Sequence, residues 1–187
     1  MIGPVFDRDC FKIVSLFALS PGSRFKREEI KKKIRLNNVP LDKALAKLVN
    51  CRILKSEKSL YGLDFESENA KKIVEMASKQ YKDLRDIPLD VFLLLTDLAD
   101  ALSTMKGIEL YLFGSYAKLI YREKSDIDVA VIVDRLPKSL DLASLSQKLE
   151  KTYGKRVQIH DFEKVSFYKN KDDPLISDIL RNGVLLL

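Results

Sequence analysis

Residues 112–117 read LFGSYA, and residues 125–132 read SDIDVAVI. In the second stretch apolar residues alternate with the two aspartates, which predicts a β-strand with Asp126 and Asp128 on one face. By the rise of a strand their Cα atoms lie roughly 6 to 7 Å apart, so both carboxylates can converge on Mg²⁺ ions. The opposite face is apolar, and its burial fixes the register of the strand. Its members are Ile127, Val129, Val131 and Val133.

The first stretch predicts a second strand that ends in a turn. An apolar run from Ile108 to Phe113 stops at Gly114-Ser115. Glycine lets the backbone approach a phosphate closely, and the Ser115 hydroxyl with the amides after it can donate to phosphate oxygens. A helix opening at Tyr116–Leu119 would add its N-terminal dipole. The expected chemistry is electrostatic and positional, since no Ser/His/Asp or Cys/His set is evident.

Together the two motifs resemble the signature of the DNA polymerase beta-like nucleotidyltransferases, and within them the minimal nucleotidyltransferases. That signature is Gly-Ser, ten residues and Asp-x-Asp, and ten residues separate Gly114-Ser115 from Asp126-Ile127-Asp128 here. The resemblance covers about residues 106–187. The alternative interpretation, which does not use this resemblance, is that the two motifs are a surface turn followed by a solvent-exposed acidic strand.

The resemblance implies transfer of a nucleoside monophosphate from a Mg²⁺-bound nucleoside triphosphate, with ATP as the first candidate. It implies that Asp126 and Asp128 are catalytic and bind the metal. The nucleotide-binding residues that it implies are Gly114, Ser115, Lys118 and Ser125. The acceptor is not named by the sequence. Relatives modify small molecules, RNA ends or partner proteins, including toxins neutralised by adenylylation.

Two positions depart from the family pattern. Residues 117–119 read Ala-Lys-Leu where many minimal members have Ala-Arg-Gly. The expected third carboxylate falls on Gln158, with His160 next on the same strand face. His160 is either a general base or a strand-end residue hydrogen-bonded to a neighbour. Asp161 is expected on the opposite face of this strand from Gln158 and His160, unless a β-bulge shifts it.

Charge divides the chain into two parts. Residues 1–66 carry 14 Lys or Arg against 8 Asp or Glu, whereas residues 67–187 carry 19 of each. The whole net charge of +6 therefore belongs to the first third. A basic unit beside a neutral one favours an acidic partner, with nucleic acid as the leading candidate.

The first third resembles a winged helix-turn-helix. Helices are expected over residues 10–19, 26–35 and 41–50, with a turn at residues 37–40, and a hairpin follows with strands over 52–55 and 60–65. In that fold residues 41–50 are the recognition helix. The candidate DNA contacts are Lys43, Lys47, Asn50, Lys55 and Lys58. Winged helices also dock proteins, and Lys31–Lys33 can equally be a solvated helix face.

The expected fold class is α/β (α+β), with a small mixed sheet flanked by helices in the second part. The expected domains are a winged helix over residues 1–66, a linker helix over 67–88 and a nucleotidyltransferase over 89–187. Further helices are expected over residues 67–84, 89–105, 139–153 and 174–181. The leucines of residues 89–105 face the sheet or form a homodimer seam.

The remaining sequence features set limits. Cys10 and Cys51 lack metal-ligand spacing and are expected to be reduced, buried thiols of a cytoplasmic protein. There is no secretory signal, and no apolar run reaches the roughly 18 residues of a membrane span, so no membrane partner is expected. The alternative function is a DNA-binding regulator or antitoxin-like protein whose nucleotidyltransferase fold is a nucleotide sensor or inactive scaffold. Gln158 and Leu119 favour that alternative.

Overall fold

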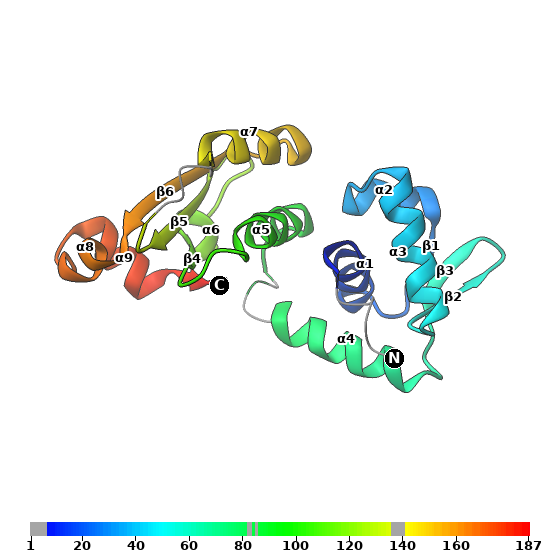
Figure 1. Ribbon diagram of the computed structural model, residues 1–187. Helices are drawn as coiled ribbons and strands as arrows, with labels where there is room; N and C mark the ends of the chain where they lie inside the picture. The colour runs from blue at the N-terminus through cyan, green and yellow to red at the C-terminus, as the bar shows by residue number, and fades with distance from the viewer. Residues whose placement is uncertain (1–6, 82–83, 85, 136–140) are drawn as a thin grey trace. The chain divides into compact units, whose positions relative to one another are not determined.

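The computed structural model describes residues 7–81, 84, 86–135 and 141–187. The chain divides into two compact units, Met1–Arg85 and Asp86–Leu187, whose elements are labelled in Figure 1. The expected class is confirmed, because each unit contains a small sheet accompanied by helices. None of the described helices is both long and apolar enough to cross a membrane.

The first unit combines four helices with a three-stranded antiparallel sheet in the order β1-β3-β2. The helices are α1 (Arg8–Leu19), α2 (Arg27–Ile34), α3 (Asn38–Asn50) and α4 (Glu68–Tyr81). The strands are β1 (Phe25–Lys26), β2 (Leu54–Glu57) and β3 (Leu60–Leu63). Lys58 and Ser59 join β2 to β3 with φ values of 50° and 65°. Positive φ at both positions is what a tight hairpin of type I′ needs.

Helix α1 forms the centre of this unit. Cys10, Ile13 and Phe17 on α1 are fully buried, and the helix contacts α3 and α4. The segment expected as a linker is therefore a helix of the first unit, since α4 lies against α1 and buries Ala70 and Ala77.

Both cysteines are free thiols. Burial, with the neighbouring Asp7, raises the pKa of Cys10 to about 12, so this thiol stays protonated and unreactive at neutral pH. Cys51 is only partly buried.

The second unit is built on a mixed four-stranded sheet in the order β6-β5-β4-β7. The strands are β4 (Glu109–Phe113), β5 (Ile127–Val133), β6 (Val157–Glu163) and β7 (Val184–Leu185). Strands β5 and β6 are parallel, and the other two pairs are antiparallel. The helices are α5 (Leu89–Leu102), α6 (Gly114–Ala117), α7 (Leu142–Tyr153), α8 (Lys164–Lys169) and α9 (Pro174–Asn182).

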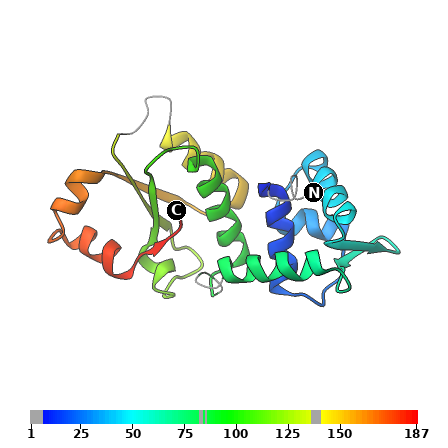
Figure 2. The ribbon, with the colours of Figure 1, turned by 60° about the horizontal axis from the view of Figure 1, so that its bottom comes forward.

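Helices cover both faces of this sheet, with α8 and α9 on one side and α5 and α7 on the other (Figure 2). On the α8–α9 side, an apolar cluster is formed by Phe113, Ala130, Ile132, Phe167, Ile176 and Ile179. Asp128, Ala130 and Ile132 are two residues apart along β5, so their side chains share one face of the sheet. Asp128 therefore lies on this face, beyond the end of the cluster. The other face of β5 is fully apolar and buried, as expected.

On the α5–α7 side, the leucines of α5 are buried within the chain, Leu93, Leu94, Leu95, Leu98 and Leu102 among them. They form part of the core of the chain, so the structure gives no exposed leucine seam on this helix. The Tyr153 hydroxyl of α7 donates to Asp97 and to the Leu93 carbonyl of α5, which ties the two helices together.

Several element boundaries differ from the sequence expectation. Helix α3 begins at Asn38, because Pro40 lacks an N–H and is tolerated in a first helical turn. The first hairpin strand runs over Leu54–Glu57 rather than 52–55, since Arg52 has a left-handed φ of 55°. Helix α5 ends at Leu102, short of residue 105. The expected start of the helix at residue 139 lies outside the described residues. Strand β1 and helix α8 were not expected.

Candidate active site

The Gly-Ser turn and the second aspartate form one structure. Strand β4 ends at Phe113, whose partner on β5 is Asp128. The next residue, Gly114, has a φ of +69°, a conformation that favours glycine. A Cβ added to Gly114 would collide with Oδ2 of Asp128. Backbone conformation and steric space therefore both favour glycine here.

Asp126 and Asp128 lie at the start of β5, and both are partly buried. Burial raises the pKa of the Asp128 carboxyl; His160 offsets part of the rise, and the charge on Asp126 adds to it. Asp128 accepts no hydrogen bond from the residues that the structure describes. Two adjacent carboxylates, one of them desolvated and without a donor, are suited to a positively charged ligand.

Gln158 occupies the position of the expected third carboxylate. Strand β6 places it directly beside Asp128 in the parallel register. Its Nε2 donates a hydrogen bond of 2.5 Å to Oδ2 of Asp126. Nη1 of Arg156 lies 3.8 Å from the same oxygen. An amide and a guanidinium therefore share one oxygen of Asp126.

His160 is next on the same face of β6, beside Ala130. Its ring packs edge-to-face on Phe113, with centroids 5.4 Å apart. In the described part of the chain His160 makes no hydrogen bond, and its charge interacts with the Asp128 carboxyl. Asp161 pairs with Val131 in an uninterrupted ladder and is exposed. No bulge brings Asp161 to the carboxylates.

The segment after the turn differs from the expected helix. Helix α6 is a single turn, Gly114–Ala117, and Leu119 follows it with a φ of +57°. This left-handed conformation is the one that a glycine would adopt without strain. Tyr116 is buried and stacks on Tyr121 at a centroid distance of 4.4 Å, which folds the loop back on itself.

Two of the expected nucleotide ligands have protein partners. Nζ of Lys118 forms an ion pair with Asp178 of α9, with an N–O distance of 2.7 Å. Oγ of Ser125 accepts a hydrogen bond of 2.8 Å from the backbone N–H of Arg122, so it stabilises the turn before β5. Ser115 is partly exposed beside Gly114.

The donor set fits Mg²⁺ that is shared with phosphate. Mg²⁺ is usually held by one or two carboxylates together with substrate phosphates and water, and Asp126 and Asp128 match that pattern. Within the described ranges there is no group of three or more His, Cys, Asp and Glu side chains that could hold a metal ion alone.

The candidate DNA-contact residues of the first unit differ in solvent exposure and in whether they already form an ion pair. Lys43 and Asn50 are exposed on α3. Nζ of Lys47 lies 2.5 Å from Asp7, which itself caps α1 by accepting from the Cys10 N–H. Lys55 pairs with Glu57 at 3.3 Å, while Lys58 is exposed in the hairpin turn.

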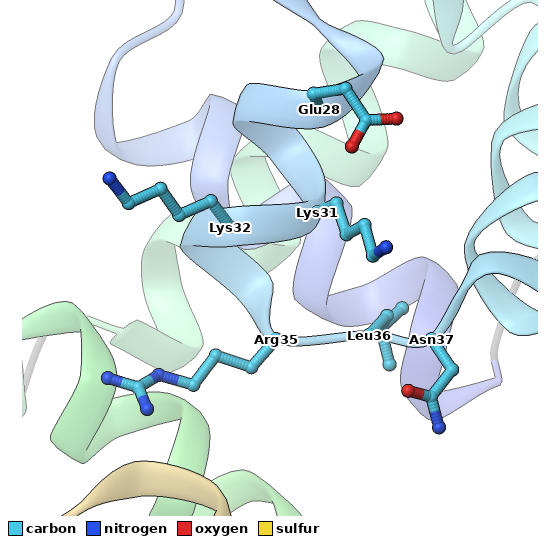
Figure 3. Close-up of a pocket in the computed structure, with 6 residues that line it drawn as sticks. All are labelled: Glu28, Lys31, Lys32, Arg35, Leu36 and Asn37. Atoms are coloured by element: carbon cyan, nitrogen blue, oxygen red, sulfur yellow. The ribbon is translucent and has the colours of Figure 1, made fainter.

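A basic pocket lies at the end of α2. It is lined by Glu28, Lys31, Lys32, Arg35, Leu36 and Asn37. Lys31 and Lys32 leave α2 in different directions (Figure 3), and neither forms an ion pair with a residue in the described ranges. In the sequence, the run of lysines at residues 31–33 indicated a basic surface here, but the same run is also typical of a solvent-exposed helix face.

Comparisons with known proteins concern the second unit. Residues 96–187 match the family model described as "Polymerase beta, Nucleotidyltransferase". A solved structure of the toxin-antitoxin MntA-HpeT mutant is 22% identical, with a TM-score of 0.39, and the alignment covers 50% of this chain and 72% of that chain. A solved toxin-antitoxin structure with AMP-PNP is 25% identical, with a TM-score of 0.37, and the alignment covers 52% and 70%. A search of curated proteins found no match.

The family match begins within α5 and includes all four strands of the second sheet. It also includes the Gly114 turn and both aspartates. Residues 96–187 are therefore similar to a polymerase beta-like nucleotidyltransferase domain.

Proposed function

We propose that the second unit transfers a nucleoside monophosphate from a Mg²⁺-bound nucleoside triphosphate, ATP first among them, to an acceptor, and releases the other two phosphates as pyrophosphate. The observation that carries this proposal is the contact between Gly114 and Asp128. It leaves little room for a side chain at the turn, so a phosphate at Gly114 would lie beside the carboxylates that would hold the metal.

The residues of the site have separate roles in this proposal. Mg²⁺ bound by Asp126 and Asp128 would neutralise the phosphate oxygens and polarise the bond to be broken. The Ser115 hydroxyl and the amides after Gly114 would donate to the phosphates. Lys118 would contact the triphosphate after leaving Asp178, because both anions compete for one ammonium group.

Nucleotide binding tests the proposal before the acceptor is known. We would measure ATP binding by calorimetry with and without Mg²⁺ for the wild type, Asp126→Asn and Asp128→Asn. We expect binding to require Mg²⁺ and to be lost in both variants, since each loses a ligand charge without a change of shape. Asp161→Asn is the matched control, because Asp161 is exposed and lies on the opposite face of β6 from Gln158. Failure of every triphosphate to bind would refute the proposal.

A second candidate function is a regulator or antitoxin-like protein whose domain senses a nucleotide without transferring it. The observation that favours it is the Gln158 amide on Asp126, where the family pattern has a carboxylate. Label transfer from ATP separates the two functions. Retained nucleotide binding with no transfer to small molecules, RNA ends or a partner protein such as a toxin would favour the sensor.

We also propose that residues 1–66 form a winged helix that binds DNA. Helices α1 to α3 precede the β2–β3 hairpin, the order of elements in that fold. Helix α3 exposes Lys43 and Asn50, and the unit is basic. Binding would rely mainly on phosphate contacts, so it would weaken steeply with salt.

Fluorescence anisotropy with duplex DNA over a salt series tests this surface. Lys43→Ala should weaken binding and lower the slope of log K against log salt by about 0.9 for one lost phosphate contact. Lys47→Ala should have a smaller effect, because Asp7 already neutralises that ammonium group. Lys72→Ala, exposed on α4, is the matched control. No binding at low salt would refute DNA as the partner.

A further inference from the structure

A neutral amide donor and a guanidinium lie beside one oxygen of Asp126. Nε2 of Gln158 donates to Oδ2 at 2.5 Å, and Nη1 of Arg156 lies 3.8 Å from the same atom. The Asp126 side chain is only 29% exposed, so these contacts account for much of its surroundings. Oδ2 of Asp126 is therefore already satisfied from the β6 side.

The charges that the protein itself supplies at this site match one divalent cation. Asp126 and Asp128 supply two negative charges, and Gln158 is neutral. Sites that hold two metal ions about 3.5–4 Å apart clamp both the attacking and the leaving oxygen, and each Mg²⁺ needs its own octahedral set of oxygen ligands. On the β6 side a second cation would meet an amide hydrogen and a guanidinium instead of a carboxylate.

We propose that Gln158 is a positioning residue that fixes the Asp126 carboxylate and limits the site to one divalent cation. That cation is the one that accompanies the triphosphate. The inference rests on the proposed function, since it concerns the same site, and adds how many metal ions the site takes. It predicts that a carboxylate at position 158 creates a second metal site.

Manganese counting tests this directly, without measuring catalysis. The full chain is saturated with a non-hydrolysable ATP analogue, and bound Mn²⁺ is counted by electron paramagnetic resonance. We expect one Mn²⁺ per chain for the wild type and two for Gln158→Asp, with Gln158→Glu as a second acidic variant. Gln158→Leu should keep one ion with about 10-fold weaker affinity, because Asp126 loses its orienting hydrogen bond.

Arg156→Gln is the matched control. It removes the neighbouring charge but keeps the amide, so the count should stay at one. Circular dichroism melting establishes that each variant is folded. A purely structural role for Gln158 predicts one ion in every folded variant, and that result would overturn the inference.

Failure of this inference is distinguishable from failure of the proposed function. Two ions in the wild type, with metal-dependent nucleotide binding intact, overturn the inference alone. No metal and no nucleotide bound to the wild type overturn both.

Discussion

Lys118 and Asp178 are joined across 60 residues of sequence, with N–O distances of 2.7 and 2.9 Å. The pair links the loop after the Gly-Ser turn to α9. The side chain of Asn182, one turn later on α9, donates to Oδ1 of Asp178, which is also the oxygen nearer to Lys118. The Lys118 hydrogen bond and that of Asn182 lower the pKa of Asp178, so the carboxylate competes with a nucleotide for Lys118 at neutral pH.

Asp178→Asn should therefore tighten ATP binding. The variant leaves Lys118 without its anionic partner, and an exposed pair of this kind contributes up to about 1 kcal/mol. We expect an affinity gain of up to about fivefold in calorimetry with Mg²⁺. Asp173→Asn, on the N-cap of the same helix, should leave affinity unchanged. Equal or weaker ATP binding by Asp178→Asn would show that Lys118 does not reach the nucleotide.

Gly114→Ala should abolish nucleotide binding and destabilise the domain. The new methyl group would collide with the Asp128 carboxylate, and the backbone would have to keep a positive φ. A loss of about 1–3 kcal/mol is expected from the strain, measured as the free energy of unfolding in urea. Gly154→Ala is the control, because it shares a positive φ of 67° without any atom within 4 Å of the added Cβ. Equal losses in the two variants would contradict a steric role for Asp128.

Leu119→Gly should stabilise the protein. Leu119 has a left-handed φ of 57° and is 51% exposed, so its side chain contributes little packing. Relief of the strain outweighs the greater freedom of glycine in the unfolded chain, for a gain of about 0.5–1 kcal/mol in urea denaturation. Leu119→Ala keeps the strain and should not gain. A loss of stability in Leu119→Gly would mean that the leucine side chain is needed.

Asp128→Asn should become more stable relative to the wild type as the pH rises. Burial raises the pKa of Asp128 in the folded state, so the folded protein binds this proton more tightly than the unfolded chain does. Stability is then lost as the pH rises from the unfolded pKa, about 3.9, through the folded one. The amide carries no such penalty. Urea denaturation without metal should show Asp128→Asn more stable than the wild type at pH 7 and the two alike at pH 3. A lower stability of the variant at pH 7 would contradict this assignment.

The sequence predicted the parts of the site that depend on local pattern. Alternation along residues 125–132 places Asp126 and Asp128 together, and the apolar opposite face is buried as expected. Alternation also puts Gln158 and Asp128 on a common face, and the parallel register makes them neighbours. These features follow from the two-residue period of a strand and from burial of one face.

Contacts between distant residues were not predictable in this way. Lys118 matched a family cation, but nothing near it in sequence indicates Asp178. Lys47 fitted an exposed helix face, yet Asp7, 40 residues earlier, lies against it. The amphipathic pattern of residues 67–84 could not distinguish a bridging helix from α4, which lies on α1. Such pairings depend on how elements pack, which periodicity within one element does not encode.

Strand β6, which supplies Gln158, is also an edge of its sheet. Among the described strands it pairs only with β5, so its outer backbone groups could template another β-strand. Charged side chains lie along it at Asp161 and Glu163, with Arg156 just before it, and such charges discourage aggregation through an open edge. Substitutions that neutralise these charges would therefore affect the solubility of the protein as well as its chemistry.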